Sequence, residues 1–340
     1  MNYYIRRIAQ AIVTFLVGMF LTFSLYRLVP GGPVEMIMAE RVQRMQQRGN
    51  TVNSQRIAEM TEQLTGINPD KPIPVAFFEW LRDIVLYQDF GESILFQDPV
   101  FDILFRGMPW SIFLSVYGLL LGFTATIAVG VFMAWHEGTK IDSGLTVFIL
   151  VMRSIPYYVA AIVMLSVLAF QWGLFPTGGR APPAADPGFN LEFMIGISRH
   201  AALPIISNFI VGFAGGAIGM RALSVRVVGA DFLRSARLRG LGTNRILSRY
   251  LTRNSILPLY TGFMMGIAGM FSSNVITERI FQYHGAGWFL LEAAVNQDYP
   301  LVMAAFVFFS GITVLGILIA DLTYGLIDPR AGTGASRESF

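Results

Sequence analysis

Cysteine is absent from the 340-residue sequence, and histidine occurs only three times. Without cysteine, the chain can form neither a disulfide bond nor a metal site with thiolate ligands. The three histidines, His136, His200 and His284, lie far apart in the sequence. We therefore expect no histidine-based metal centre and no cofactor bound by this chain.

Lysine is nearly absent too, and its two positions exclude the phosphate-binding loop of P-loop nucleotide hydrolases. That loop needs Gly-Lys-Ser/Thr, whereas Lys71 lies in Asp-Lys-Pro and Lys140 lies in Thr-Lys-Ile. The sequence also lacks an HExxH zinc motif. Glu278 and His284 are close in sequence, but we expect them to be exposed polar residues of a turn rather than catalytic partners. The sequence thus predicts a protein without enzymatic activity of its own.

Charged residues are scarce, at 14% of the chain, compared with about 25% in a typical soluble domain. Hydrophobic residues make up 54%. A membrane-spanning helix needs about 20 predominantly apolar residues, and six uncharged stretches approach or exceed that length. These stretches are 8–26, 109–135, 154–170, 201–220, 254–277 and 299–320. The sequence therefore predicts an all-α membrane protein with six transmembrane helices.

Basic residues are distributed unevenly between the two sides that these helices would define. With the N-terminus in the cytoplasm, the cytoplasmic segments hold 14 basic and 6 acidic residues, and the outer segments hold 11 and 16. Arginine and lysine favour the cytoplasmic side. The decisive segment is 221–253, which carries eight arginines. The pattern predicts that both termini of this multi-pass protein are cytoplasmic.

The predicted spans divide the chain into four parts. These are the cytoplasmic N-terminus with the first helix (1–28), an extracytoplasmic segment (29–108), a core with the other five helices (109–330) and a cytoplasmic tail (331–340). Within the extracytoplasmic segment, Ser54 begins one predicted amphipathic helix. Phe77, Trp80, Leu81 and Ile84 share one side of another. We therefore expect a helical insertion between the first and second transmembrane helices.

Glycine and proline mark particular positions in the predicted spans. Small residues let helix backbones approach closely in a membrane, and glycines recur at a spacing of four in Gly212/Gly216 and Gly262/Gly266. Tight helix packing is one interpretation, and a moving or pore-lining interface is the other. Pro156 is expected to bend the third helix near its cytoplasmic end, either as a plain kink or as part of a gate.

The arginine-rich segment has the pattern of two short helices joined by a glycine. We expect Asp231 to cap a helix over 232–239 and Gly240 to end it in a left-handed turn. Thr243 would then cap a second helix, in which Ile246, Leu247, Tyr250 and Leu251 form an apolar side. Attraction to anionic lipid would explain the charge alone, whereas two capped helices around a hinge favour docking into a cytoplasmic partner. No nucleic-acid-binding fold surrounds the segment, so we expect no nucleic acid partner.

None of the six spans carries an ionisable residue near its middle. Ion-coupled transporters often keep such a residue within the membrane. Its absence disfavours a stand-alone channel or ion-coupled transporter, although this class and a membrane-anchored scaffold remain alternatives.

Several motifs, in this order, resemble the inner-membrane permeases of ATP-binding-cassette importers, specifically the dipeptide/oligopeptide/nickel group. The resemblance covers nearly the whole chain. The motifs are "RRIAQAIVTFLVGMFLTFSLYRLVPGGP", "DFGES", "RSIPYY", "RHAALP", "DFLRSARLRGLGTNRILSRYLTRNSILP", "TERIFQYHGAGWFLLEAAVNQDYPLV" and "ADLTYGLIDPR". The chain departs from the family pattern at Gly32 and Arg226, where an acidic residue is common.

The resemblance implies the type I importer permease fold in a bacterial or archaeal cytoplasmic membrane. It implies pairing with a second, similar permease subunit and two ATPase subunits, which bind ATP and magnesium. An extracytoplasmic binding protein would deliver the solute. The implied cargo is a di- or oligopeptide, with oligosaccharides, nickel and glutathione as alternatives within the family.

The resemblance also assigns site residues. The residues implied to couple to the ATPase subunit are Asp231, Phe232, Ala236, Arg237, Arg239, Gly240, Leu241 and Pro258. Those expected in helix packing or the translocation path are Pro156, Gly212, Gly216, Gly262 and Gly266. Arginines of the coupling segment would pair with acidic residues of the ATPase subunit.

Overall fold

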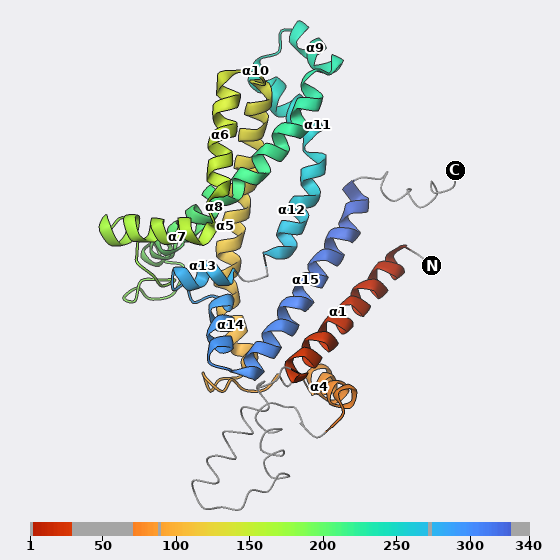
Figure 1. The fold of residues 1–340 in the computed structure, drawn as a ribbon, viewed down its shortest axis with the longest axis vertical. Helices are drawn as coiled ribbons and strands as arrows, with labels where there is room; N and C mark the ends of the chain where they lie inside the picture. The colour runs from red at the N-terminus through yellow and green to blue at the C-terminus, as the bar shows by residue number, and fades with distance from the viewer. Residues whose placement is uncertain (1–2, 29–70, 88–89, 271–273, 328–340) are drawn as a thin grey trace, which may run out of the picture. The chain divides into compact units, whose positions relative to one another are not determined.

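A computed structural model describes residues 3–28, 71–87, 90–270 and 274–327 of the chain, and every regular element in these ranges is a helix (Figure 1). An isolated antiparallel bridge joins Glu92 and Pro99. The chain forms two compact units, Met1–Pro109 with Gly285–Phe340 and Trp110–His284. The helix expected to begin at Ser54 lies outside the described residues.

The first unit consists of helices from both ends of the chain. They are α1 (Tyr3–Leu28), α4 (Ile73–Tyr87), the start of α5 (Val100–Trp135), α14 (Ala286–Val295) and α15 (Tyr299–Ile327). Helices α1 and α15 lie side by side (Figure 1). Phe77 and Ile84 of α4 are buried, and the Phe77 ring packs edge-on against Phe23 of α1, with 5.6 Å between the centroids. The amphipathic helix predicted here is thus confirmed.

Asp298, just before α15, ties down the loop that precedes α5. Its buried carboxylate accepts hydrogen bonds from the hydroxyl of Ser93 and from the backbone N–H of Leu95, at 3.1 Å in the second case. A buried carboxylate is costly unless such donors satisfy it. Ser93 belongs to the "DFGES" motif, so this motif attaches the loop before α5 to the residue before α15.

The second unit is built around α8. Its helices are the end of α5, α6 (Lys140–Ser154), α7 (Tyr157–Met164), the π-helix η1 (Leu165–Gln171), α8 (Leu191–Val228), α9 (Asp231–Leu238), α10 (Thr243–Arg245), the π-helix η2 (Ile246–Leu251), α11 (Thr252–Ser255), α12 (Leu257–Gly269) and α13 (Val275–Ile280). Helix α8 packs against α6 and α7. It also approaches α5 closely, because a β-carbon built on Gly130 would lie 2.5 Å from the β-carbon of Met220.

Four described helices are long and apolar enough to cross a membrane. These stretches are Ile5–Leu25, Val100–Trp135, Leu191–Val228 and Tyr299–Ile319. The pair formed by α6 and α7–η1 would be a fifth if it counts as one span. Apolar side chains cover the outer helix faces, as lipid contact requires; Ile12 is 54% exposed and Val147 is 61% exposed. The count of six spans therefore stays a prediction.

Pro156 bends the chain, but not where the sequence suggested. It immediately precedes α7, and the two helices of the pair meet at 90°. We expected the bend near the cytoplasmic end of one helix. It lies between two apolar helices instead, because residues 140–154 are themselves helical.

Two other helices extend well beyond the apolar stretches that predicted them. Helix α5 begins at Val100 rather than 109, and α8 begins at Leu191 rather than 201. Asn190 caps α8 by accepting a hydrogen bond from the N–H of Phe193 at 2.8 Å. Polar and charged residues are common at helix ends, so a search for uncharged runs finds the membrane core of a helix and misses its ends.

Candidate coupling surface and cavity

Helix α9 lies at one end of the second unit (Figure 1) and has one buried face. Leu233 and Ala236 are buried and pack in one apolar cluster with Met220, Ile246 and Leu251. Outside this buried face, Leu238 is 81% exposed and Phe232 is 41% exposed. The helix is therefore anchored along one side and leaves apolar side chains on the other.

The expected side-chain caps of this segment are wrong. Ala230, not Asp231, is the N-cap of α9, and Gly242, not Thr243, precedes α10. Neither of the predicted capping residues makes a side-chain capping bond within the described chain. Ala230 has extended backbone angles (φ −70°, ψ 143°), so the helix starts one residue early and Asp231 falls in its first turn. A negative charge there still interacts favourably with the helix dipole.

Gly240 ends α9 as predicted, in a left-handed conformation with φ +72°. The N–H of Leu241 donates to the carbonyl of Ala236 at 3.3 Å, and the N–H of Gly240 donates to the carbonyl of Arg237 at 2.9 Å. This is the hydrogen-bond pattern of the Schellman motif. The motif confirms the predicted turn and fixes the direction in which the chain leaves α9.

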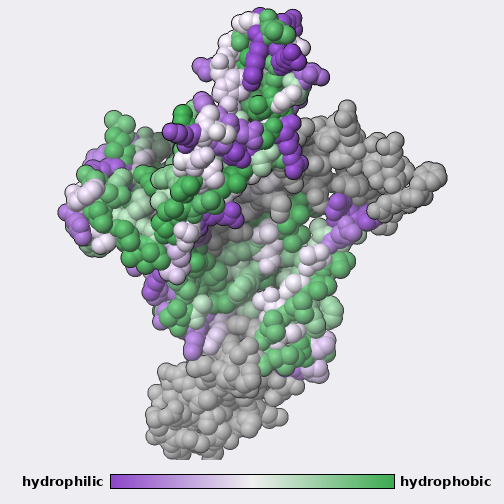
Figure 2. All heavy atoms as spheres, turned by 45° about the horizontal axis from the view of Figure 1, so that its top comes forward, coloured by the Kyte–Doolittle hydropathy of each residue, from purple (hydrophilic) through white to green (hydrophobic). Residues whose placement is uncertain are grey.

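The second short helix also has the predicted apolar side. Ile246 and Leu251 are buried, and Leu247 and Tyr250 pack against the same cluster. Pro258 lies in the first turn of α12, where its missing N–H costs no helical hydrogen bond. Exposed arginines surround the end of the unit, and they are Arg234, Arg239, Arg245, Arg249 and Arg253. Hydrophilic surface accordingly gathers over the end that carries α9 and α10 (Figure 2).

Arg237 has an aromatic partner inside the chain. Its guanidinium lies over the ring of Trp135, at 4.4 Å from the centroid. Trp135 is the last residue of α5. This cation–π contact connects α9 directly to α5, so Arg237, an expected coupling residue, also binds within the unit.

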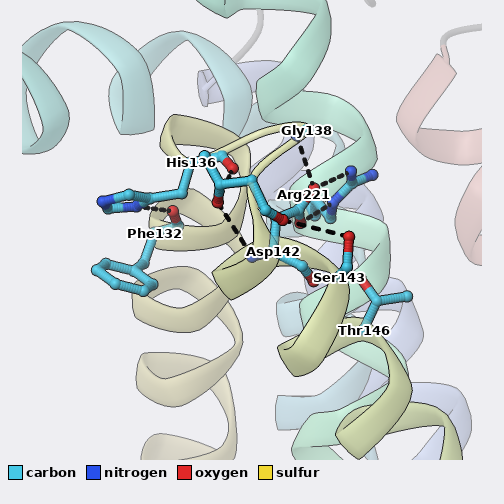
Figure 3. A network of polar contacts seen from close by, with 8 residues as sticks. Phe132, His136, Gly138, Asp142, Ser143, Thr146 and Arg221 are labelled. Atoms are coloured by element: carbon cyan, nitrogen blue, oxygen red, sulfur yellow. Dashed lines mark hydrogen bonds and ion pairs between the residues drawn. The ribbon is translucent and has the colours of Figure 1, made fainter.

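Asp142 and Arg221 form a bidentate salt bridge between α6 and α8 (Figure 3). The Arg221 Nε lies 2.7 Å from Oδ1 of Asp142, and Nη2 lies 2.6 Å from Oδ2. The Asp142 side chain is only 5% exposed. Its carboxylate also accepts the N–H of Gly138 at 3.2 Å, and Thr139 caps α6 through the N–H of Asp142. Sequence reasoning missed this pair, and the one hint was an acidic residue within an apolar helix.

The second unit contains a cavity of about 460 Å³. It is lined by Gly118, Leu119, Gly122, Phe123, Thr126, Asn208, Phe209, Gly212, Phe213, Gly216, Leu259, Gly262 and Phe263. Among these residues, Thr126 and Asn208 are the polar ones. The Phe123 and Phe263 rings pack against each other, with centroids 4.3 Å apart. The cavity is thus mainly apolar, with five glycines in its wall.

The four predicted glycines fall into two classes. β-Carbons built on Gly216 and Gly266 would lie 2.5 Å from Thr126 Oγ1 and 2.6 Å from Leu119 Cδ1 respectively, so these glycines serve helix packing. No described atom lies within 4 Å of such a carbon on Gly212 or Gly262, and both face the cavity. Pro156 is not among the described lining residues. Tight packing thus explains Gly216 and Gly266, whereas a moving or pore-lining interface at Gly212 and Gly262 stays a prediction.

A polar network holds the side chain of Asn208. Its Nδ2 donates to Thr277 Oγ1 at 3.1 Å, and Thr277 also bonds the Tyr157 hydroxyl at 2.8 Å. The neighbouring Glu278 is fully buried and accepts a hydrogen bond from Ser111 at 2.6 Å. The expectation that Glu278 is exposed is therefore wrong, because α13 packs against α7 and α8.

Burial, and then the charge of Arg180, lower the pKa of His284, which leaves the imidazole neutral at pH 7.

The sequence matches two family descriptions that together cover most of the chain. Residues 126–333 match the "Binding-protein-dependent transport system inner membrane component", and residues 1–115 match the N-terminal part of such membrane components. The chain belongs to this family of inner-membrane permeases. It is a transport subunit rather than an enzyme, and partner ATPases hydrolyse ATP. A binding protein is its other general partner.

Individual relatives cover almost the whole permease. A probable peptide ABC transporter permease of Sinorhizobium fredii is 31% identical, over 96% of this chain and 98% of the relative. An oligopeptide transport system permease of Bacillus subtilis is 30% identical over the same shares. A di/tripeptide transport system permease of Pseudomonas aeruginosa is 28% identical, over 97% of this chain and 98% of the relative. This permease is thus a multi-pass inner-membrane protein similar to peptide permeases.

Proposed function

We propose that this permease forms half of the translocation path of an ATP-driven peptide importer. A second, similar permease subunit supplies the other half, two ATPase subunits bind beneath the arginine-rich segment, and an extracytoplasmic binding protein delivers the peptide. The similarity to three peptide permeases supports this cargo. Six membrane spans with cytoplasmic termini complete the proposal.

The exposed side of α9 is the observation that carries the proposal. Leu238 and Phe232 offer apolar contact area, and Arg234 and Arg239 are exposed beside them. Exposed apolar side chains flanked by arginines fit a groove on the partner with an apolar floor and acidic residues at its edge, since arginine pairs strongly with carboxylates. The buried side, Leu233 and Ala236, transmits displacement of α9 into the unit.

The cavity is the proposed section of the peptide path. Its wall carries no charged residue among those that line it, so it repels neither acidic nor basic cargo. The Nδ2 of Asn208 already donates to the carbonyl of Pro204 and to Thr277, but its Oδ1 can accept a hydrogen bond from a peptide N–H of any sequence. An apolar wall with two polar side chains, Thr126 and Asn208, suits a series of peptides, and the binding protein then selects among them. Oligosaccharides, nickel and glutathione are the alternative cargoes in this family.

Reconstitution of the complete transporter in liposomes tests the proposal. With a labelled di- or oligopeptide, the binding protein and ATP, we expect uptake that stops when ATP or the ATPase subunits are omitted. Flux through the permease alone would instead show a stand-alone channel or ion-coupled transporter. Binding of partners without ATP-dependent uptake would show a scaffold.

A further inference from the structure

The turn between α5 and α6 is attached twice to the segment that carries the coupling helix. Trp135 stands at one end of this turn and holds Arg237 of α9 at 4.4 Å. Asp142 stands at the other end and holds Arg221 of α8 through bonds of 2.6 and 2.7 Å. The chain thus closes a ring from α8 through α9 to α5, and back through the turn to α8.

The Asp142–Arg221 pair fixes geometry more than it adds stability. A buried ion pair loses hydration and is often no more stabilising than apolar residues of the same size. Its two parallel hydrogen bonds, however, fix both the distance and the orientation of the guanidinium relative to the carboxylate. The extra bond from the N–H of Gly138 immobilises the carboxylate in the turn. These contacts fix the position of Arg221 on α8 relative to the start of α6.

The ring matters because the backbone link between α8 and α9 is short. Helix α8 ends at Val228, and α9 starts at Asp231. Gly229 lies between them, and the N–H of Ala230 donates to the carbonyl of Val227 at 3.0 Å, so a single turn joins the two helices. We expect the contacts of α9 with Trp135 and of α8 with Asp142 to limit rotation about this turn.

We propose that Asp142 and Arg221 are positioning residues for energy coupling, which brace the coupling helix against the α5–α6 turn together with Trp135 and Arg237. This inference rests on the proposed function. With the brace intact, displacement of α9 by the ATPase subunits moves α5, α6 and α8 together. With the brace broken, Leu233 and Ala236 still pack in the apolar cluster, but α9 and these helices move less closely together, and less peptide is transported per ATP hydrolysed.

The test measures peptide transported per ATP hydrolysed in the reconstituted transporter. Asp142→Asn removes the charge, and Arg221→Lys keeps the charge but loses the two-pronged geometry. Coupling residues typically change coupling free energies by about 0.5–2 kcal/mol, so we expect the ratio to fall roughly 2- to 30-fold while ATP hydrolysis continues. Glu79→Gln, which breaks the exposed Lys71–Glu79 pair of 2.7 Å, is the matched control and should leave the ratio unchanged. A variant that merely weakened folding would lower both activities and keep their ratio.

A distance measurement tests the brace without relying on transport. The chain has no cysteine, so spin labels at Ser235→Cys on α9 and Gly144→Cys on α6, both exposed, report one distance. In the otherwise unchanged transporter, ATP should leave this distance constant, and Arg221→Lys should let it change or broaden. A normal transport ratio in both variants, or a distance that Arg221→Lys does not affect, overturns the inference. Lack of uptake by the unmodified transporter would refute the proposed function instead, and the spin labels would still report on the brace.

Discussion

Gly216 faces Thr126 so closely that a β-carbon at residue 216 would lie 2.5 Å from the threonine hydroxyl oxygen. Gly212, one helical turn earlier, faces open cavity. We expect Gly216→Ala to separate α5 from α8 and to lower the stability of the permease by about 1–3 kcal/mol. The midpoint of thermal unfolding in detergent measures this effect.

Gly212→Ala is the matched control, since it adds the same methyl group to the same helix where space is free. Its unfolding midpoint should stay within a degree or so of the unchanged permease or rise, because alanine favours a helix over glycine by about 1 kcal/mol. Equal destabilisation by the two substitutions would contradict the assignment of Gly216 to packing.

Gly240 carries the left-handed backbone that ends α9. We expect Gly240→Ala to cost about 1–2 kcal/mol, because the β-carbon of an L-residue crowds the following carbonyl in this conformation. The strain redirects the chain after α9, so ATP-dependent peptide uptake should fall while the protein still inserts into the membrane. Uptake and membrane-fraction immunoblots measure the two effects separately.

Gly242→Ala provides the comparison, two residues further along the same turn. Gly242 has φ −62°, which alanine adopts without strain, and no described atom lies within 4 Å of a β-carbon there. Normal uptake in both variants would show that the conformation of Gly240 is unimportant for coupling.

The sequence predicts the outline of the coupling segment better than its attachments. Gly240 was predictable because a left-handed residue after a helix is usually glycine. Asp231 was misplaced by a single position, since acidic residues are favourable both at the N-cap and in the first turn. Local signals of this kind identify a helix end without fixing which residue makes each bond.

The Asp142–Arg221 pair was not predictable from the sequence because 79 residues separate its members. Their meeting depends on how α6 and α8 pack, and an apolar helix has few polar residues that would show its orientation. The same limit applies to Gly212 and Gly216. Their spacing marks one side of α8, but only the packed unit shows which glycine meets a neighbour and which faces the cavity.

Substitution of Leu238 tests the docking of α9 separately from the folding of the permease. Its side chain is 81% exposed, so Leu238→Ala should leave the stability of the isolated permease nearly unchanged. If it fills an apolar groove in the ATPase subunit, the dissociation constant of the complex should rise about tenfold, since 1.4 kcal/mol corresponds to that factor. Unfolding midpoints and ATPase binding to the permease in lipid nanodiscs measure the two quantities.

Leu233→Ala makes the same chemical change on the opposite, fully buried side of α9. It should lower the free energy of unfolding by about 2–5 kcal/mol, because it opens a void in the apolar cluster. Unchanged ATPase binding by Leu238→Ala, with the loss confined to Leu233→Ala, would show that the exposed side of α9 is not the docking surface.

Phe263 lines the cavity, and its ring packs against that of Phe123, with centroids 4.3 Å apart. Phe263→Ala removes a whole ring from the wall, so bulkier solutes should pass more readily. We expect the uptake of oligopeptides to rise several-fold relative to that of dipeptides, since the new space favours larger side chains at roughly 1–3 kcal/mol per pocket change. Competition between two labelled peptides in the same liposomes gives this ratio directly.

Phe132→Ala is the control, because Phe132 is exposed and packs on His136 away from the cavity. An unaltered ratio in Phe263→Ala, with uptake still dependent on ATP, would place the peptide path elsewhere in the permease.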